Sequence, residues 1–70
     1  MNIKNIRNFL ASKIGANITI IYYGSRNRKE RYSGILYKVY RNIFTIRLCN
    51  GEIKSFNYID ILTKTIRIFI

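Results

Sequence analysis

The residues best able to do chemistry lie in a short, strongly basic segment in the first half of the chain. Four cations fall within six residues there, namely Arg26, Arg28, Lys29 and Arg31. The segment follows Gly24 and Ser25, whose small side chains let a ligand approach the backbone. Arginine guanidinium groups bind phosphate oxygens in a bidentate geometry. The segment therefore predicts a phosphate-binding loop, and the alternative is a solvated hairpin tip that contributes nothing to binding.

A second group of candidates depends on how two strands pair around the Asn-Gly dipeptide at residues 50–51, the strongest hairpin signal in the chain. With a two-residue turn, Arg47 lies opposite Lys54, and Phe56 and Tyr58 share their face. Two cations beside two aromatic rings would form a platform that binds an anion and stacks on bases. A three-residue loop with a bulge instead turns Phe56 and Tyr58 into the core. The need for buried surface in so short a chain favours the bulge, and the sequence leaves both registers open.

The chain also has six tyrosines interleaved with its cations, a pattern found in proteins that bind single-stranded nucleic acid. Tyrosine is equally common on strands because it fits a half-buried pleated surface. Tyr32 and Tyr37 are the two that we expect at the surface. The candidate nucleic-acid-binding residues are therefore Arg26, Arg28, Lys29, Arg31, Arg47, Lys54, Tyr32 and Tyr37.

The sequence lacks the residues that most catalytic and metal sites need. It has no histidine, and its single cysteine, Cys49, has no disulfide partner in the chain and is expected to be a reduced thiol. One cysteine without histidine cannot supply the four ligands of a zinc site. The three carboxylates are scattered, and we expect Asp60 to cap a turn rather than to transfer protons. We therefore expect no enzyme, no catalytic residues, no metal and no cofactor.

The charge balance points to a polyanionic partner. The 70-residue chain has 13 Lys and Arg against three Asp and Glu, a net charge of +10, and 49% hydrophobic residues. That hydrophobic content is too high for a disordered tail, so we expect a single domain over residues 1–70 with a strong positive field. The field favours DNA or RNA as partner. The alternatives are a protein partner, with the charge as steering, or charge that only keeps the domain in solution.

The elements that would position these residues are one helix and five short strands. Apolar residues recur at helical spacing over residues 2–14, with Asn2 as N-cap and Gly15 as the stop. Strands with period-two alternation are expected at 17–23, 31–40, 43–49, 53–58 and 63–70, with a short turn at 59–62. Gly34 inside the second strand indicates a bend or bulge. The predicted fold is mostly β with one N-terminal α-helix, a small five-stranded SH3-like or Sm-like barrel.

Two elements suggest interactions of their own. The basic amphipathic helix docks on the barrel or lies on a membrane surface. No signal peptide and no apolar run of about 20 residues is visible, so we expect no membrane partner. The last strand turns Phe69 away from its three isoleucines. An exposed apolar edge strand would pair with a second copy, so a homodimer is a further expectation unless the helix covers Phe69.

Two longer patterns carry a resemblance to a known family. The first is a Gly-x-Leu-x-x-x-Tyr-x-x-x-Phe ladder over residues 34–44, and the second is a Ser-aromatic-x-Tyr-x-Asp-Ile-Leu-Thr block over residues 55–63. In order and spacing the chain closely resembles the Veg family of small proteins from Gram-positive bacteria. Family members usually carry Arg in place of Tyr32 and Pro in place of Arg41, and their loop between the third and fourth strands is often longer and acidic.

The resemblance implies a cytoplasmic protein made during vegetative growth, with a small β-barrel fold and no catalytic residues or cofactors. It also implies a part in biofilm formation, through raised expression of matrix genes and antagonism of their repressor. We therefore predict a regulator of gene expression that binds nucleic acid through its basic surface. The alternatives are a protein-binding adaptor that antagonises a transcriptional repressor, and a ribosome- or polymerase-associated factor.

Overall fold

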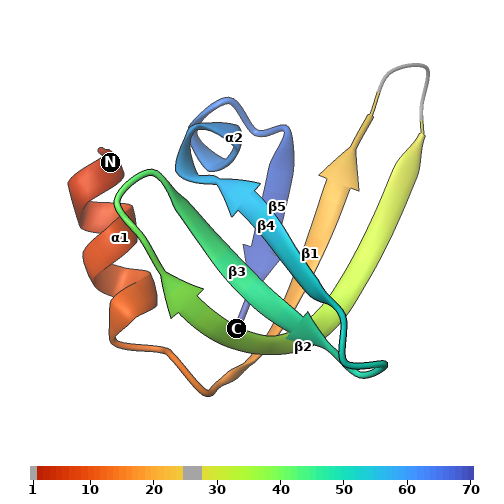
Figure 1. Cartoon of the computed structure of the whole chain (residues 1–70). Coiled ribbons are helices and arrows are strands. Elements are labelled where there is room, and N and C mark those ends of the chain that lie inside the picture. Colours follow the sequence, from red (N-terminus) through yellow and green to blue (C-terminus); the bar gives the residue numbers. More distant parts are fainter. Residues whose placement is uncertain (1, 25–27) are drawn as a thin grey trace.

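The computed structural model describes residues 2–24 and 28–70, and this part of the chain forms a curved sheet with two helices (Figure 1). In chain order the elements are α1 (Ile3–Ala11), β1 (Asn17–Tyr23), β2 (Lys29–Val39), β3 (Ile43–Leu48), β4 (Ile53–Asn57), α2 (Tyr58–Leu62) and β5 (Ile66–Phe69). All strand pairs are antiparallel, and the strands follow one another in the order β4-β3-β2-β1-β5. The predicted fold class, mostly β with an N-terminal helix, is confirmed.

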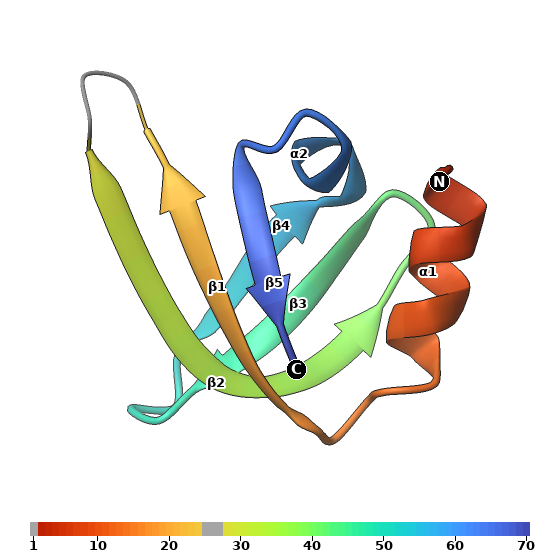
Figure 2. The ribbon, with the colours of Figure 1, turned by 180° about the vertical axis from the view of Figure 1, so that it is seen from behind.

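The word barrel describes this sheet only loosely. The strands β4 and β5 stand at the two ends of the strand order, so the described sheet is open (Figures 1 and 2). Residues 59–62, which we expected to form a turn, belong to helix α2. The connection between the two edge strands thus runs through a helical turn, whereas a tight hairpin would have paired them directly.

Helix α1 forms where the sequence predicts it and ends three residues earlier. The side chain of Asn2 accepts a hydrogen bond from the backbone N–H of Asn5 at 2.8 Å, which caps the first turn. The helix ends at Ala11, and a turn leads to Gly15, whose φ of +93° lies in the left-handed region that favours glycine. Ile6 and Leu10 are buried, so this face of α1 packs against β2 and α2.

The core lies between the two halves of the bent sheet and is closed at one side by α1. Its fully buried members are Ile6, Leu10, Ile18, Ile20, Leu36, Phe44, Ile46, Tyr58 and Ile66. Phe69 lies on the other face of β5 and is 53% exposed, so α1 does not cover it. The homodimer expected from this edge strand stays a prediction.

Strand β2 bends at Gly34, which lets one strand serve both halves of the sheet. Its first part pairs with β1 and its second part with β3, and Gly34 itself is opposite both Ile18 and Leu48. A Cβ atom at Gly34 would lie 2.2 Å from the carbonyl oxygen of Arg47. Only glycine therefore allows β3 to pass this closely. The pairing with β3 also shifts register between Leu36 and Lys38, so the predicted bend is accompanied by a bulge.

The hairpin of β3 and β4 adopts the bulged register, one of the two alternatives left open by the sequence. Phe44 is opposite Phe56, and the N–H of Leu48 donates to the carbonyl of Glu52 at 2.8 Å across the loop of residues 49–51. Gly51 has a φ of +90°, as the left-handed position of such a loop requires. The Phe56 ring consequently packs against the core, and Tyr58, at the start of α2, is fully buried.

We expect Gly34→Ala to destabilise the fold strongly, because the added Cβ would overlap backbone atoms of Arg47 that cannot move independently. Overpacking of this kind costs about 2–3 kcal/mol in the free energy of unfolding, measurable by urea denaturation. Gly24→Ala is the matched control, since the closest atom to its Cβ would be a side-chain carbon of Tyr22, at 3.3 Å, and its contacts with Arg28, at 3.5 and 3.7 Å, are ordinary van der Waals distances. Equal losses in the two variants would contradict the close approach at Gly34.

We expect the stability to fall above pH 10 in a way that depends on Tyr58. Burial raises the pKa of Tyr58 above its ordinary value of 10.0, while the positive charge of Arg7 opposes the rise. Because the folded pKa exceeds the unfolded one, neutral Tyr58 contributes stability below about pH 10, and that contribution is lost as the pH rises through the folded pKa.

The variant Tyr58→Phe cannot ionise, so its free energy of unfolding should fall less steeply above pH 10 than that of the wild type. It also leaves the carbonyl of Tyr40 without its hydroxyl donor, which should cost about 1 kcal/mol at neutral pH. Denaturant titrations of both proteins at neutral and alkaline pH measure both effects. Parallel pH profiles would show that Tyr58 does not carry the alkaline loss.

Candidate nucleic-acid interface

Strand alternation sorts the charges of the basic segment onto two faces of the sheet. Lys29 and Arg31 occupy alternate positions of β2 and are exposed on its outer face. Glu30 lies between them in sequence and points to the inner face, where its carboxylate accepts a hydrogen bond from the hydroxyl of Tyr32 at 2.5 Å. The carboxylate therefore does not lie beside the two cations that flank it in sequence.

Tyr23 stands at the point where three segments meet. Its backbone N–H donates to the carbonyl of Thr65 at 2.8 Å, and the next N–H, that of Gly24, donates to the carbonyl of Arg28 at 2.8 Å. Successive N–H groups of a strand point to opposite sides, so these bonds hold the start of β5 on one side of Tyr23 and the start of β2 on the other. The Tyr23 side chain is 37% exposed, with the ammonium of Lys29 5.6 Å from its ring centroid.

Cations gather on both sides of this ring. Tyr23 lines one shallow hollow together with Arg28 and Lys29, and another with Lys64 and Arg67. Ile21 is the outward-facing residue of β1 that lies two positions before Tyr23. It is opposite Arg31 on β2 and Arg67 on β5. Adjacent strands are about 4.8 Å apart, so the backbones of these two arginines are separated by about 10 Å. We call this surface the basic face, defined by Tyr23, Lys29, Arg31, Lys64 and Arg67. Arg28 only borders it, because a Cβ atom added at Gly24 would meet both the Tyr22 ring, at 3.3 Å, and the Cβ of Arg28, at 3.5 Å, which puts Arg28 on the Tyr22 side of the hairpin.

The three carboxylates of the chain lie away from the basic face. Glu30 and Asp60 line a hollow on the inner side of the sheet, together with Lys54. Glu52 follows the turn between β3 and β4, far from the end of β1 and the start of β2 (Figures 1 and 2). Glu30 is the nearest of the three in the chain, since it adjoins Lys29 and Arg31 along β2, but its side chain is on the opposite face of the strand.

The structure brings together only part of the site predicted from the sequence. Lys29 and Arg31 lie on the basic face, Arg28 borders it from the Tyr22 side, and Arg26 falls outside the described residues. Tyr32 lies on the inner face, with its ring centroid 5.7 Å from that of Phe56. The hydrogen bond to Glu30 and partial burial raise the pKa of the Tyr32 hydroxyl. The ammonium of Lys54 is 5.1 Å from the Tyr32 ring centroid, which makes these two residues one inner cluster.

The platform expected from the two-residue turn does not form. In the observed register Arg47 is opposite Ile53, and Lys54 is opposite Ile46. A shift of one residue places Arg47 and Lys54 on opposite faces, since strand side chains alternate with a period of two. The aromatic rings of Phe56 and Tyr58, the other half of the platform, pack in or against the core. Burial of these rings outweighs the turn type that would have exposed them.

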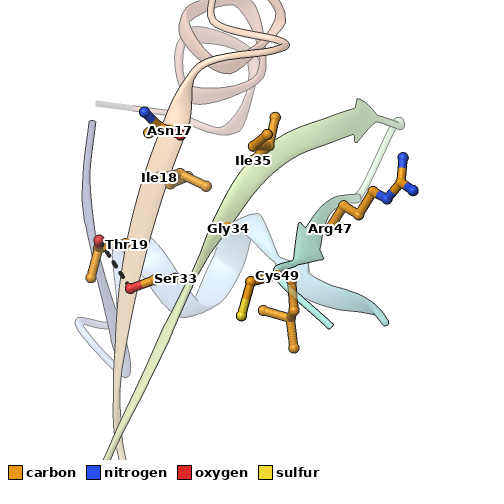
Figure 3. Close-up of a pocket in the computed structure, with 9 residues that line it drawn as sticks. Asn17, Ile18, Thr19, Ser33, Gly34, Ile35, Arg47 and Cys49 are labelled. Atoms are coloured by element: carbon orange, nitrogen blue, oxygen red, sulfur yellow. Dashed lines mark hydrogen bonds between the residues drawn. The ribbon is translucent and has the colours of Figure 1, made fainter. Parts of the chain in front are cut away.

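Arg47 lines a separate hollow of about 550 Å³ beside the bend of β2 (Figure 3). The guanidinium reaches away from this hollow, and the hydroxyls of Thr19 and Ser33 are turned to one another, 3.4 Å apart. Cys49, an exposed free thiol, stands at its rim. These polar groups do not converge on a common point, as the groups that orient a small ligand would.

Tyr37, the remaining candidate, is exposed on the second half of β2. Its ring lies 5.4 Å from the ammonium of Lys38. It is eight residues along the strand from Lys29, a contour of about 26 Å. The structure thus places Tyr37 apart from the basic face.

Sequence reasoning missed Tyr23, Lys64 and Arg67. The alternation of β1 could have placed the Tyr23 ring outward, beside Lys29 and Arg31. No local signal shows that β5 pairs with β1, and that pairing is what brings Arg67 to this surface. Lys64 has a φ of +62°, in a left-handed position after α2 where glycine or asparagine is usual. The turn between α2 and β5, which contains this left-handed residue, places Lys64 beside Tyr23.

Two further observations concern metal sites and membrane-spanning helices. Within residues 2–24 and 28–70, no three His, Cys, Asp or Glu side chains are grouped so that they could hold a metal ion. Over the same residues, neither α1 nor α2 has the length and apolar character needed to cross a membrane.

Comparison with known proteins identifies the family. No individually curated protein matches the chain. The family model described as biofilm formation stimulator Veg matches residues 1–69, which confirms the resemblance seen in the ladder and block motifs. Because this match covers all but the last of the 70 residues, the chain belongs to the Veg family of biofilm formation stimulators.

Proposed function

We propose that this Veg-family protein is a non-enzymatic regulator of gene expression that binds nucleic acid through the basic face. The observation that carries the proposal is the gathering of four cations around one exposed tyrosine, on a face from which none of the described carboxylate side chains points outward. These cations are Lys29, Arg31, Lys64 and Arg67. Contacts of this kind with phosphate oxygens supply most of the affinity of proteins for nucleic acid.

The arrangement favours a phosphate backbone over a single small anion. The cations flank β1 on both sides, and the backbones of Arg31 and Arg67 are about 10 Å apart. A single phosphate ion can bridge two of these side chains at most, whereas consecutive phosphates of a polymer can reach the cations on both sides of β1 along its length. Two of the four cations are arginines, whose planar guanidinium groups suit bidentate phosphate contacts.

Membership of the Veg family suggests that the protein stimulates biofilm formation. Binding to nucleic acid would be the molecular step through which such a protein changes gene expression. The alternative is an adaptor that antagonises a transcriptional repressor by contacting protein alone, in which case the basic face only steers the encounter.

Charge reversal of two arginines that face outward on different strands tests the proposal. Each phosphate contact adds about 0.7–0.9 to the slope of log affinity against log salt, so four cations predict a wild-type slope of about −2.8 to −3.6. We expect Arg31→Glu combined with Arg67→Glu to reduce the slope to about −1.4 to −1.8 and to weaken binding. Fluorescence anisotropy with labelled DNA and RNA at several salt concentrations measures both quantities.

The matched control is Lys4→Glu combined with Lys13→Glu, which makes the same change in net charge on exposed residues of α1 and the turn that follows it. This control should keep the wild-type slope. Equal losses in both double variants would show that net charge, rather than the basic face, governs binding. Absence of wild-type binding at low salt would overturn the proposal in favour of the protein-binding adaptor.

A further inference from the structure

We infer that the basic face takes single-stranded nucleic acid, with one base stacked on the ring of Tyr23 and the flanking phosphates held by the cations on either side. The inference rests on the proposed function, which requires only that the face bind phosphates. It adds the strandedness of the ligand and names the residue that contacts a base.

The surroundings of Tyr23 have the form that stacking on a base requires. The ring is exposed on the outer face of β1 and lines two hollows, one leading to Arg28 and Lys29 and the other to Lys64 and Arg67. A backbone that crosses from one hollow to the other would place a phosphate in each and one nucleotide over the ring. Stacking of a base on an aromatic side chain works with any base, because every base has a π-face.

The shape of the face argues against readout of base edges in a duplex groove. Reading base edges in a major groove requires a helix or a two-stranded ribbon that fits a width of about 12 Å. The basic face spans three strands, β2, β1 and β5, whose outer backbones alone are about 10 Å apart before side chains are added. The longer helix, α1, lies at the other side of the molecule from the β1–β2 hairpin in both views (Figures 1 and 2). The three-stranded width of the basic face and the remote position of α1 therefore favour stacking on an unpaired base over groove readout.

The other tyrosines of the β1–β2 hairpin have different surroundings. Tyr22 lines the inner hollow, which also contains the carboxylates of Glu30 and Asp60 and would repel a phosphate. Tyr32 shares that hollow, and its half-buried ring packs against the ring of Phe56. Tyr23 is thus the tyrosine of this hairpin that combines exposure with cations on two sides.

The experiment compares single strands with a duplex and tests the ring by substitution. The probes are labelled oligothymidylate and oligouridylate of about twelve nucleotides, within the span that a small β-barrel covers, and a duplex of the same length. We expect the wild type to bind at least one single strand about tenfold more tightly than the duplex at equal salt. The thymidylate and uridylate arms show whether DNA or RNA is preferred, since the 2′-hydroxyl distinguishes the backbones.

Three variants separate stacking from charge. Tyr23→Ala should weaken single-strand binding by about tenfold, within the range observed for loss of one stacked base, and change duplex binding less than about twofold. Tyr23→Phe keeps the ring and should stay within about twofold of the wild type. Tyr40→Ala removes an exposed tyrosine beyond the end of β2, outside the basic face, and should leave both affinities unchanged. Circular dichroism confirms that each variant is folded.

The outcomes distinguish the two proposals. Duplex binding as tight as single-strand binding, or a Tyr23→Ala variant that behaves like Tyr40→Ala, would overturn the stacking inference while salt-dependent binding upholds the proposed function. Loss of affinity in Tyr23→Phe equal to that in Tyr23→Ala would also overturn it, because the ring would then not be the group that matters. A wild type that binds none of the probes would overturn both.

Discussion

The close passage of β2 over the backbone of Arg47 is the constraint on which the rest of the structure depends. Without a side chain at Gly34, β2 continues through the bend and pairs with β1 on one side of it and β3 on the other. The core fills the space between the two halves. The inner face of the first half of β2 faces the core, so Lys29 and Arg31 lie on its outer face. The bend that encloses the core therefore also determines where the basic face lies.

Local patterns were enough to predict most elements but not how the sheet is completed. Period-two alternation and the Asn2 cap indicated the strands and the helix, because these depend on neighbours in sequence. The residues at 50–51 are compatible with two turn lengths, and burial of Phe56 and Tyr58 decides between them only in the folded molecule. The sheet stays open between β4 and β5 because helix α2 connects these two strands. The broken alternation at residues 59–62 predicted only a turn there.

The residues of the candidate site also divide into those that the local sequence could predict and those that it could not. Arg28, Lys29 and Arg31 are neighbours in sequence and could be recognised together. Arg67 reaches the same surface through the pairing of β5 with β1, across more than forty residues of chain, and no local pattern encodes that pairing. The predicted platform failed for the reverse reason: it assumed a register, and a shift of one residue exchanged the faces of an entire strand.

The short length of β5 has a consequence for the energetics of the basic face. A four-residue strand at the edge of a sheet, paired on one side only, is among the segments that open locally at low free-energy cost. Opening of β5 carries Arg67 away from Tyr23, so a ligand that spans both sides binds only the closed form. By linkage, such a ligand would protect the amide hydrogens of β5 from solvent exchange and bring the stability of this edge closer to that of the core.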